Sequence, residues 1–73
     1  MTLCIRLDSV EDAINLVQKV SKYDCEADIR SGNYYIDAKS VLGVIGIGTQ
    51  KKVQLDIYSE EEAILEDFKE FVA

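Results

Sequence analysis

Few side chains in this chain could act as an acid, a base or a nucleophile, and histidine is absent. A serine or cysteine nucleophile needs a base to activate it, and here only carboxylates and lysines could serve. Cys4 and Cys25 are too far apart for a CxxC redox motif and too few for a structural zinc site. We therefore expect no catalytic residue, no metal ion, no cofactor and no enzyme. A small enzyme that uses cysteine or carboxylates is the weaker alternative.

Three consecutive carboxylates stand at residues 60–62. Such a group could supply acid and base chemistry or bind a metal, but Ser59 and Glu62 also match the S-x-x-E capping box that starts a helix. Acidic side chains in the first turn are stabilised by the helix dipole. The pattern therefore predicts a helix that begins here. Its apolar residues are Ile64, Leu65, Phe68, Phe71 and Val72.

Residues 43–48 contain glycine with the spacing G-x-x-G-x-G. This segment lacks the lysine of a phosphate-binding loop and the glycine order of a dinucleotide site, so we expect no nucleotide ligand. Ser40 is the expected N-cap of a helix of one or two turns. A helix this short cannot bury all its apolar residues, which are Val41, Leu42, Val44, Ile45 and Ile47. The exposed ones indicate a protein-binding surface, with local core or a homodimer contact as alternatives.

The 73 residues carry 14 acidic and 8 basic side chains, which gives a net charge of −6. A chain of this length has room for one domain, placed over residues 1–73. The negative charge repels phosphate backbones and anionic lipids, so neither nucleic acid nor membrane is an expected partner. The sequence contains no apolar run of about 18 residues and no signal-peptide pattern, which predicts a cytoplasmic protein.

The apolar spacing predicts how the chain begins to fold. Apolar and polar residues alternate over 2–8, which is typical of a strand with one buried face. From Ala13 the spacing becomes helical and continues to about Asp24. Asp8 or Ser9 is the expected cap of this helix.

Two further alternating segments, 25–30 and 34–38, flank Ser31-Gly32-Asn33, whose residues tolerate the positive φ of a hairpin turn. Of the adjacent Tyr34 and Tyr35, only one is expected to face the core. A last strand is predicted from the alternation of Val53, Leu55 and Ile57. The order β-α-β-β-α-β-α, with the helices on one face, predicts a two-layer α+β sandwich.

Residues 37–48 resemble the segment N-A-K-S-I-M-G-V-M-S-L-G of the HPr phosphocarrier domains of the bacterial sugar phosphotransferase system. Tyr23-Asp24 is similar to the aromatic-Asp pair of the family, and residues 60–64 are similar to the acidic start of its last helix. The resemblance implies a four-stranded antiparallel sheet in the order 1-4-2-3. In that order Cys4 and Cys25 would stand two strand spacings apart, about 9–10 Å, so both are expected to be free thiols.

HPr domains carry a phosphoryl group on a histidine at the start of the first helix, within the motif H-A-R-P-A. Counting back from Tyr23-Asp24, Ser9 stands at the histidine position, Glu11 at the arginine position and Asp12 at the proline position. A carboxylate at the arginine position would repel a phosphoryl group. The resemblance therefore implies that phosphorelay through this helix has been lost.

Ser40 resembles the serine that a dedicated kinase phosphorylates in many HPr proteins. A phosphoserine there would add about −1.5 to −2 charges at a helix N-terminus, which favours an anion; alternatively, Ser40 is only an N-cap. We predict a regulatory module whose partner is a protein, such as an HPr-type serine kinase or a carbon-catabolite regulator. Its expected binding surface comprises Lys39, Ser40, Leu42, Ile45 and Ile47. The alternative is a structural or assembly module unrelated to sugar transport. A further alternative is that the chain forms a homodimer.

Overall fold

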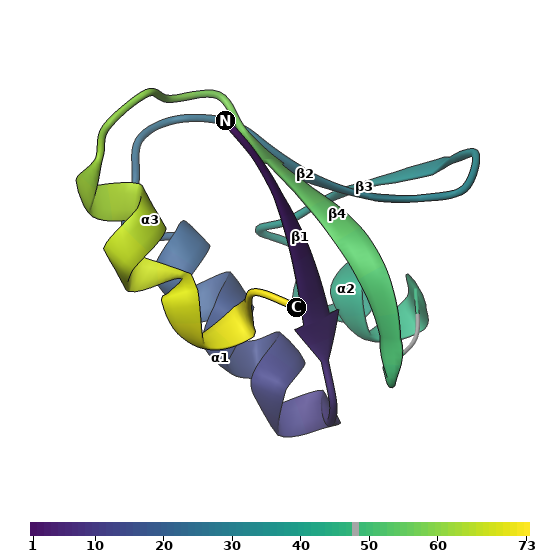
Figure 1. Ribbon diagram of the computed structural model, residues 1–73. Helices are drawn as coiled ribbons and strands as arrows, with labels where there is room; N and C mark the ends of the chain where they lie inside the picture. Colours follow the sequence, from purple (N-terminus) through teal and green to yellow (C-terminus); the bar gives the residue numbers. More distant parts are fainter. Residues whose placement is uncertain (48) are drawn as a thin grey trace.

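The computed structural model describes residues 1–47 and 49–73 and shows one antiparallel sheet with helices packed against it (Figure 1). The elements are β1 (Thr2–Leu7), α1 (Val10–Val20), β2 (Ala27–Ser31), β3 (Tyr34–Asp37), α2 (Val41–Ile47), β4 (Lys51–Ile57), α3 (Ala63–Asp67) and a 3-10 turn (Lys69–Phe71). The strand order is β1-β4-β2-β3, and every neighbouring pair is antiparallel. The predicted α+β class and the order 1-4-2-3 are confirmed. Gly48, the last glycine of the G-x-x-G-x-G segment, lies outside the described residues.

One apolar core lies between the sheet and the helices. Alternation places Ile5 and Leu7 of β1 in the core and leaves Cys4 and Arg6 on the opposite, open face of the sheet. The other fully or almost fully buried side chains are Ala13, Leu16, Val17, Val20, Ala27, Ile29, Ala38, Val44, Val53, Leu55, Ile57, Ile64, Phe68 and Phe71. Among the described residues no helix is long and apolar enough to cross a membrane.

Helix α1 ends at Val20, earlier than the predicted end near Asp24. The amides of Lys22 and Tyr23 bond to carbonyls three residues earlier, at 3.2 and 3.1 Å, which tightens and closes the last turn. The Tyr23 ring then packs against Phe68, with the ring centres 6.1 Å apart. The apolar residue that seemed to prolong the helix thus belongs to the loop after it.

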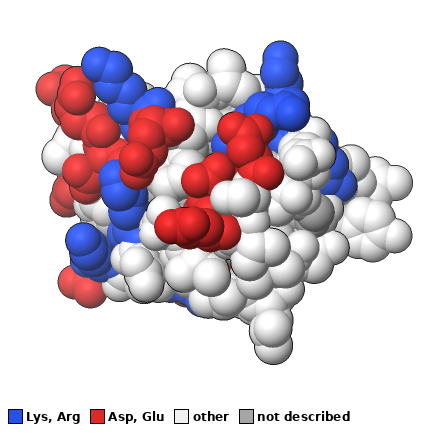
Figure 2. All heavy atoms as spheres, turned by 90° about the horizontal axis from the view of Figure 1, so that it is seen from below, with Lys and Arg blue, Asp and Glu red and all other residues white. Residues whose placement is uncertain are grey.

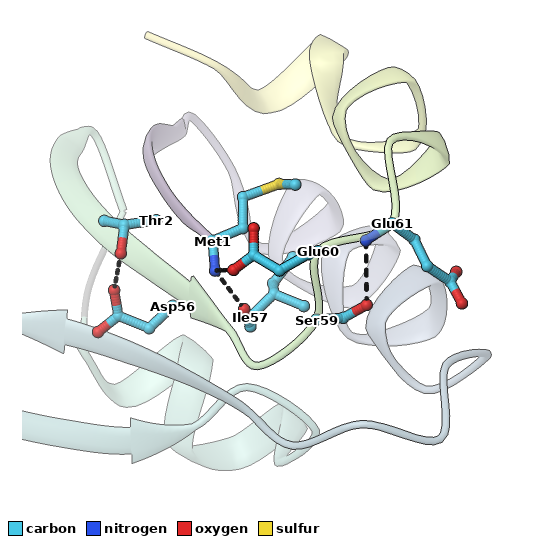
Figure 3. A network of polar contacts seen from close by, with 7 residues as sticks. All are labelled: Met1, Thr2, Asp56, Ile57, Ser59, Glu60 and Glu61. Atoms are coloured by element: carbon cyan, nitrogen blue, oxygen red, sulfur yellow. Dashed lines mark hydrogen bonds and ion pairs between the residues drawn. The ribbon is translucent and has the colours of Figure 1, made fainter.

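The capping box predicted at Ser59 and Glu62 is wrong. The Ser59 hydroxyl accepts a hydrogen bond from the Glu61 amide, at 3.3 Å, and α3 begins only at Ala63, without a side-chain cap (Figure 3). The Met1 ammonium donates to the Ile57 carbonyl at 2.7 Å and the Tyr58 amide to the Glu26 carbonyl at 3.0 Å. Together with the ion pair between the Met1 ammonium and Glu60, at 3.6 Å, these contacts fix the chain just after β4, and α3 begins only after them.

The C-terminal segment closes one edge of the sheet. Val72 forms a β-bridge with Ile5, and the Ala73 amide donates to the Cys4 carbonyl at 3.0 Å. The hydroxyl of Tyr23 donates to the carboxylate of Asp67, and this bond raises the pKa of Tyr23 to about 12. Within this segment Leu65 and Val72, predicted to lie on the apolar side, are about half exposed, at 48% and 50%.

Both tyrosines at the start of β3 are exposed, Tyr34 at 74% and Tyr35 at 61%, so the prediction that one of them faces the core is wrong. Figure 1 shows the reason: the β2–β3 hairpin projects beyond the helices, so no helix covers its tip. Further along the strand Ile36 is half-buried and Ala38, just after it, is fully buried.

Candidate functional site

Ser9 is the N-cap of α1 and has the extended backbone typical of that position, with φ −148° and ψ 167°. Its hydroxyl accepts a hydrogen bond from the Asp12 amide at 3.1 Å, and the Asp12 carboxylate accepts one from the Asp8 amide at 3.0 Å. The two bonds occupy the amides of Asp12 and Asp8, which are then not free to donate to an anion at the helix start. Of the two caps predicted, Ser9 is the one that forms.

Carboxylates surround this helix start. Asp8, Glu11 and Asp12 all lie within one turn of Ser9, and Arg6 is paired with Asp8, with 2.8 Å between Nε and Oδ1. A group of acidic side chains is visible in the middle of Figure 2. A phosphoryl group placed here would meet negative charge rather than a free cation.

Removing the Ser9 hydroxyl should weaken α1. Because a lost N-cap leaves a helix amide without its partner, Ser9→Ala is expected to lower the free energy of unfolding by about 1 kcal/mol, measured by urea denaturation. Ser9→Asn, which keeps a capping oxygen, should stay within a few tenths of a kcal/mol of the original chain. Equal losses in the two variants would show that the capping bond has no role in stability.

Ser40 caps α2 in the predicted way. Its hydroxyl accepts a hydrogen bond from the Gly43 amide at 3.2 Å, and its carbonyl accepts one from Val44 at 2.9 Å. Asp37 prepares the turn: its carboxylate accepts from the Lys39 amide at 2.9 Å, and its carbonyl accepts from the Ser40 amide at 3.0 Å. The hydroxyl of Ser40 is therefore held at the start of α2 on an exposed residue.

Of the apolar residues of α2, Leu42 is the most exposed, at 84% of its surface, and Val41 is exposed at 38%. Val44 is fully buried, and Ile45 and Ile47 are partly buried against the core. Lys39 is also half-buried, and its ammonium donates to the Tyr23 carbonyl at 2.9 Å. The predicted surface thus has Ser40 and Leu42 at its exposed centre and the other three residues at its base.

A small apolar hollow of about 210 Å³ lies where the end of α2 meets the hairpin. Its walls are formed by Ser31, Tyr34, Ile36, Gly46, Ile47 and Lys51. Sequence reasoning missed Tyr34 as part of this surface. No local sequence signal indicates it, because Tyr34 and the end of α2 become neighbours only in the folded chain.

The comparisons with known proteins identify the family. Residues 10–73 match the sequence model of the family described as "PTS HPr component phosphorylation site". The chain belongs to the HPr family. The HPr match includes the whole of α2 and its cap, and it begins one residue after Ser9.

Solved HPr structures share the fold. HPr-C-His from Thermoanaerobacter tengcongensis superposes with a TM-score of 0.75 at 22% identity, over 99% of this chain and 88% of that one. A phosphocarrier protein HPr from Bacillus anthracis str. Ames superposes with a TM-score of 0.75 at 17% identity, over 100% and 96%. No curated protein sequence matches the chain.

HPr membership bears on the expected chemistry and partners. An HPr protein is a phosphocarrier rather than a catalyst, which is consistent with the prediction of no enzyme, and HPr proteins interact with other proteins. Within residues 1–47 and 49–73 no group of three or more Cys, Asp or Glu side chains is placed to hold a metal ion. Both Cys4 and Cys25 are free thiols.

Proposed function

We propose that this HPr protein does not carry a phosphoryl group at the start of α1 and works instead as a cytoplasmic regulatory module that binds another protein. The absence of histidine from the chain supports this proposal. Ser9 and Glu11 stand where the resemblance places the histidine and the arginine of the phosphocarriers. The Ser9 hydroxyl already caps the helix, and the neighbouring carboxylates disfavour a phosphate.

The observation that carries the proposal is the exposure of Leu42. We define the α2 surface as Lys39, Ser40, Leu42, Ile45 and Ile47. A leucine that is 84% exposed contributes little to folding, whereas burying it against a partner would contribute roughly 2 kcal/mol. No residue of α2 is charged, and the lower right of Figure 2, on the side where α2 lies, is an uncharged area beside the acidic groups. An apolar centre with a polar rim is the usual composition of a protein interface.

The partner surface can be tested with two leucines. In Leu42→Asp the charge would have to be buried against the partner, so binding to a purified carbon-catabolite regulator should weaken at least about tenfold, measured by calorimetry. Leu65→Asp is the matched control, because Leu65 is an exposed helical leucine on α3 and should leave the affinity unchanged. Equal weakening by both variants would exclude α2 as the contact.

Phosphorylation of Ser40 is the proposed control of this surface. The residue is exposed, its hydroxyl lies at a helix start, and a phosphate would add about −1.5 to −2 charges next to Leu42. Incubation with an HPr-type serine kinase and ATP should add one phosphate by intact mass, and Ser40→Ala should abolish the increment while Ser9→Ala keeps it. A mass increment that persists in Ser40→Ala would contradict regulation through Ser40, but it would not contradict the proposal that the α2 surface binds a protein.

A structural or assembly module predicts a different outcome at the same surface. If Leu42 served self-association, sedimentation would show a dimer of the original chain that Leu42→Asp converts to a monomer, with no affinity for a regulator. This result would contradict the regulatory function and indicate that the α2 surface forms a homodimer.

A further inference from the structure

The open face of the sheet has a basic end. Arg6 on β1 and Lys52 on β4 are directly opposite each other, and Arg30 on β2 is opposite Gln54, two residues along β4 from Lys52. These three of the chain's eight cations therefore cluster on neighbouring strands of one face. Arg6 is neutralised by Asp8 at 2.8 Å, whereas Arg30 and Lys52 have no ion pair among the described residues.

The other end of the same face is acidic. Asp28 on β2 is directly opposite both Asp56 on β4 and Asp37 on β3. Like charges in directly opposite positions destabilise a sheet, and alternating the signs would have given favourable cross-strand pairs. Each of these carboxylates accepts a hydrogen bond within the fold, Asp28 from the Tyr58 hydroxyl at 3.0 Å, Asp37 from the Lys39 amide and Asp56 from Thr2. The basic end differs, because Lys52 has no ion pair among the described residues.

At the basic end the face is hollowed over a volume of about 580 Å³. The hollow is lined by Thr2, Cys4, Arg30, Ser31, Gly32, Lys52, Val53 and Gln54. No acidic side chain is among these lining residues. The volume falls within the range of small-molecule sites.

The groups around the hollow are positioned before any ligand arrives. The guanidinium of Arg30 donates to the Tyr35 hydroxyl at 3.2 Å and lies over that ring, 5.7 Å from its centre. The Tyr35 hydroxyl raises the pKa of Arg30, which keeps its charge. Thr2 and Gln54, which line the hollow, both donate to one oxygen of Asp56, at 2.8 and 3.2 Å, and so fix the position of that carboxylate.

We propose that this hollow binds a small phosphate monoester in its dianionic form. Arg30 would hold two phosphate oxygens through its planar fork, and Lys52 on the neighbouring strand would supply the second positive charge. An extended polyanion is a poorer fit because its next phosphates would meet the acidic end at Asp28 and Asp56. The site is on the face opposite the core and does not depend on the α2 surface.

Two neighbouring lysines provide the test, because Lys51 and Lys52 point to opposite faces of β4. Sodium phosphate is titrated into 15N-labelled protein at constant ionic strength, with chloride as the balancing salt. We expect saturable amide shifts confined to residues 30–32 and 52–54. Lys52→Gln and Arg30→Gln should each lower the affinity at least about tenfold, and Lys51→Gln should leave it within about twofold.

Cys4 gives a second measurement on the unmodified chain, since it lines the hollow and Cys25 does not. Phosphate should slow alkylation of Cys4 by iodoacetamide and leave the rate at Cys25 unchanged. The assignment is overturned by shifts that do not saturate, by equal losses in Lys51→Gln and Lys52→Gln, or by shifts at the starts of α1 and α2 instead. Tighter binding of a single-stranded oligonucleotide than of phosphate would also overturn it.

Discussion

Replacing Phe68 with alanine is expected to lower the free energy of unfolding by about 3–5 kcal/mol. The side chain is fully buried and packs between two other rings, with centres 6.1 Å away at Tyr23 and 6.4 Å away at Phe71. A domain of this length is expected to be stable by roughly 4–11 kcal/mol in total. Phe68→Ala should therefore lose a large part of the stability of the domain, seen as a lower urea midpoint by circular dichroism.

Leu65 on α3, the helix that ends just before Phe68, is the matched control. Because 48% of its surface is exposed, Leu65→Ala should cost less than about 1 kcal/mol. An α-helix of five residues is too short to be stable alone, so α3 exists only through its packing. Similar losses for both variants would mean that α3 is not held by its buried face.

The strands β1, β2 and β4 were predictable because each has one buried face. The alternation in β1 and β4 follows the observed burial residue by residue, for example at Ile5, Leu7 and Leu55. The helical stripe of α1 was also predictable, although Ile14 at its edge is 36% exposed. The sheet order came from the family resemblance, since strand periodicity carries no information about which strands are neighbours.

The start of α3 could not be predicted locally. Ser59 and Glu62 have the right spacing for a capping box, but the chain at this point is held by Met1 and Glu26, which are remote in sequence. The prediction for the hairpin tyrosines, Tyr34 and Tyr35, was wrong for a similar reason. Their exposure depends on how far the helices extend over the sheet. Local patterns define an element's type better than its ends.

Part of the candidate site could be predicted from local patterns and part could not. The cap at Ser40 and the exposure of Leu42 were predicted from a short apolar helix that cannot bury every side chain. The basic hollow on the open face was not predicted, because Arg30 and Lys52 become neighbours only through the register of β2 with β4. A cross-strand register cannot be read from one sequence without knowing which strands pair.

The two glycines that the structure describes in α2 should respond to alanine with opposite signs. A Cβ on Gly43 would lie 2.6 Å from Cγ2 of Ile36 and 3.2 Å from the Ser40 hydroxyl oxygen, whereas a Cβ on Gly46 would have no atom within 4 Å. The methyl group of Ile36 is attached to a stiff, β-branched carbon, so it cannot move aside without a rotamer or backbone change.

Gly43→Ala is therefore expected to destabilise the protein by about 1–2 kcal/mol, since overpacking outweighs the gain in helix propensity. Gly46→Ala should stabilise it by about 0.5–1 kcal/mol through propensity alone. Thermal unfolding of both variants measures the difference. Stabilisation by both would show that α2 can move away from β3 at little cost.

The same pair links the fold to the proposed binding surface. Because Gly43 lets α2 approach β3 closely, Gly43→Ala should displace the helix and weaken partner binding even though Leu42 is unchanged. Gly46→Ala leaves that approach intact and should keep the affinity. If Gly43→Ala lowers stability but binds the partner normally, the position of α2 relative to the sheet is not part of recognition, and the exposed Leu42 alone would carry it.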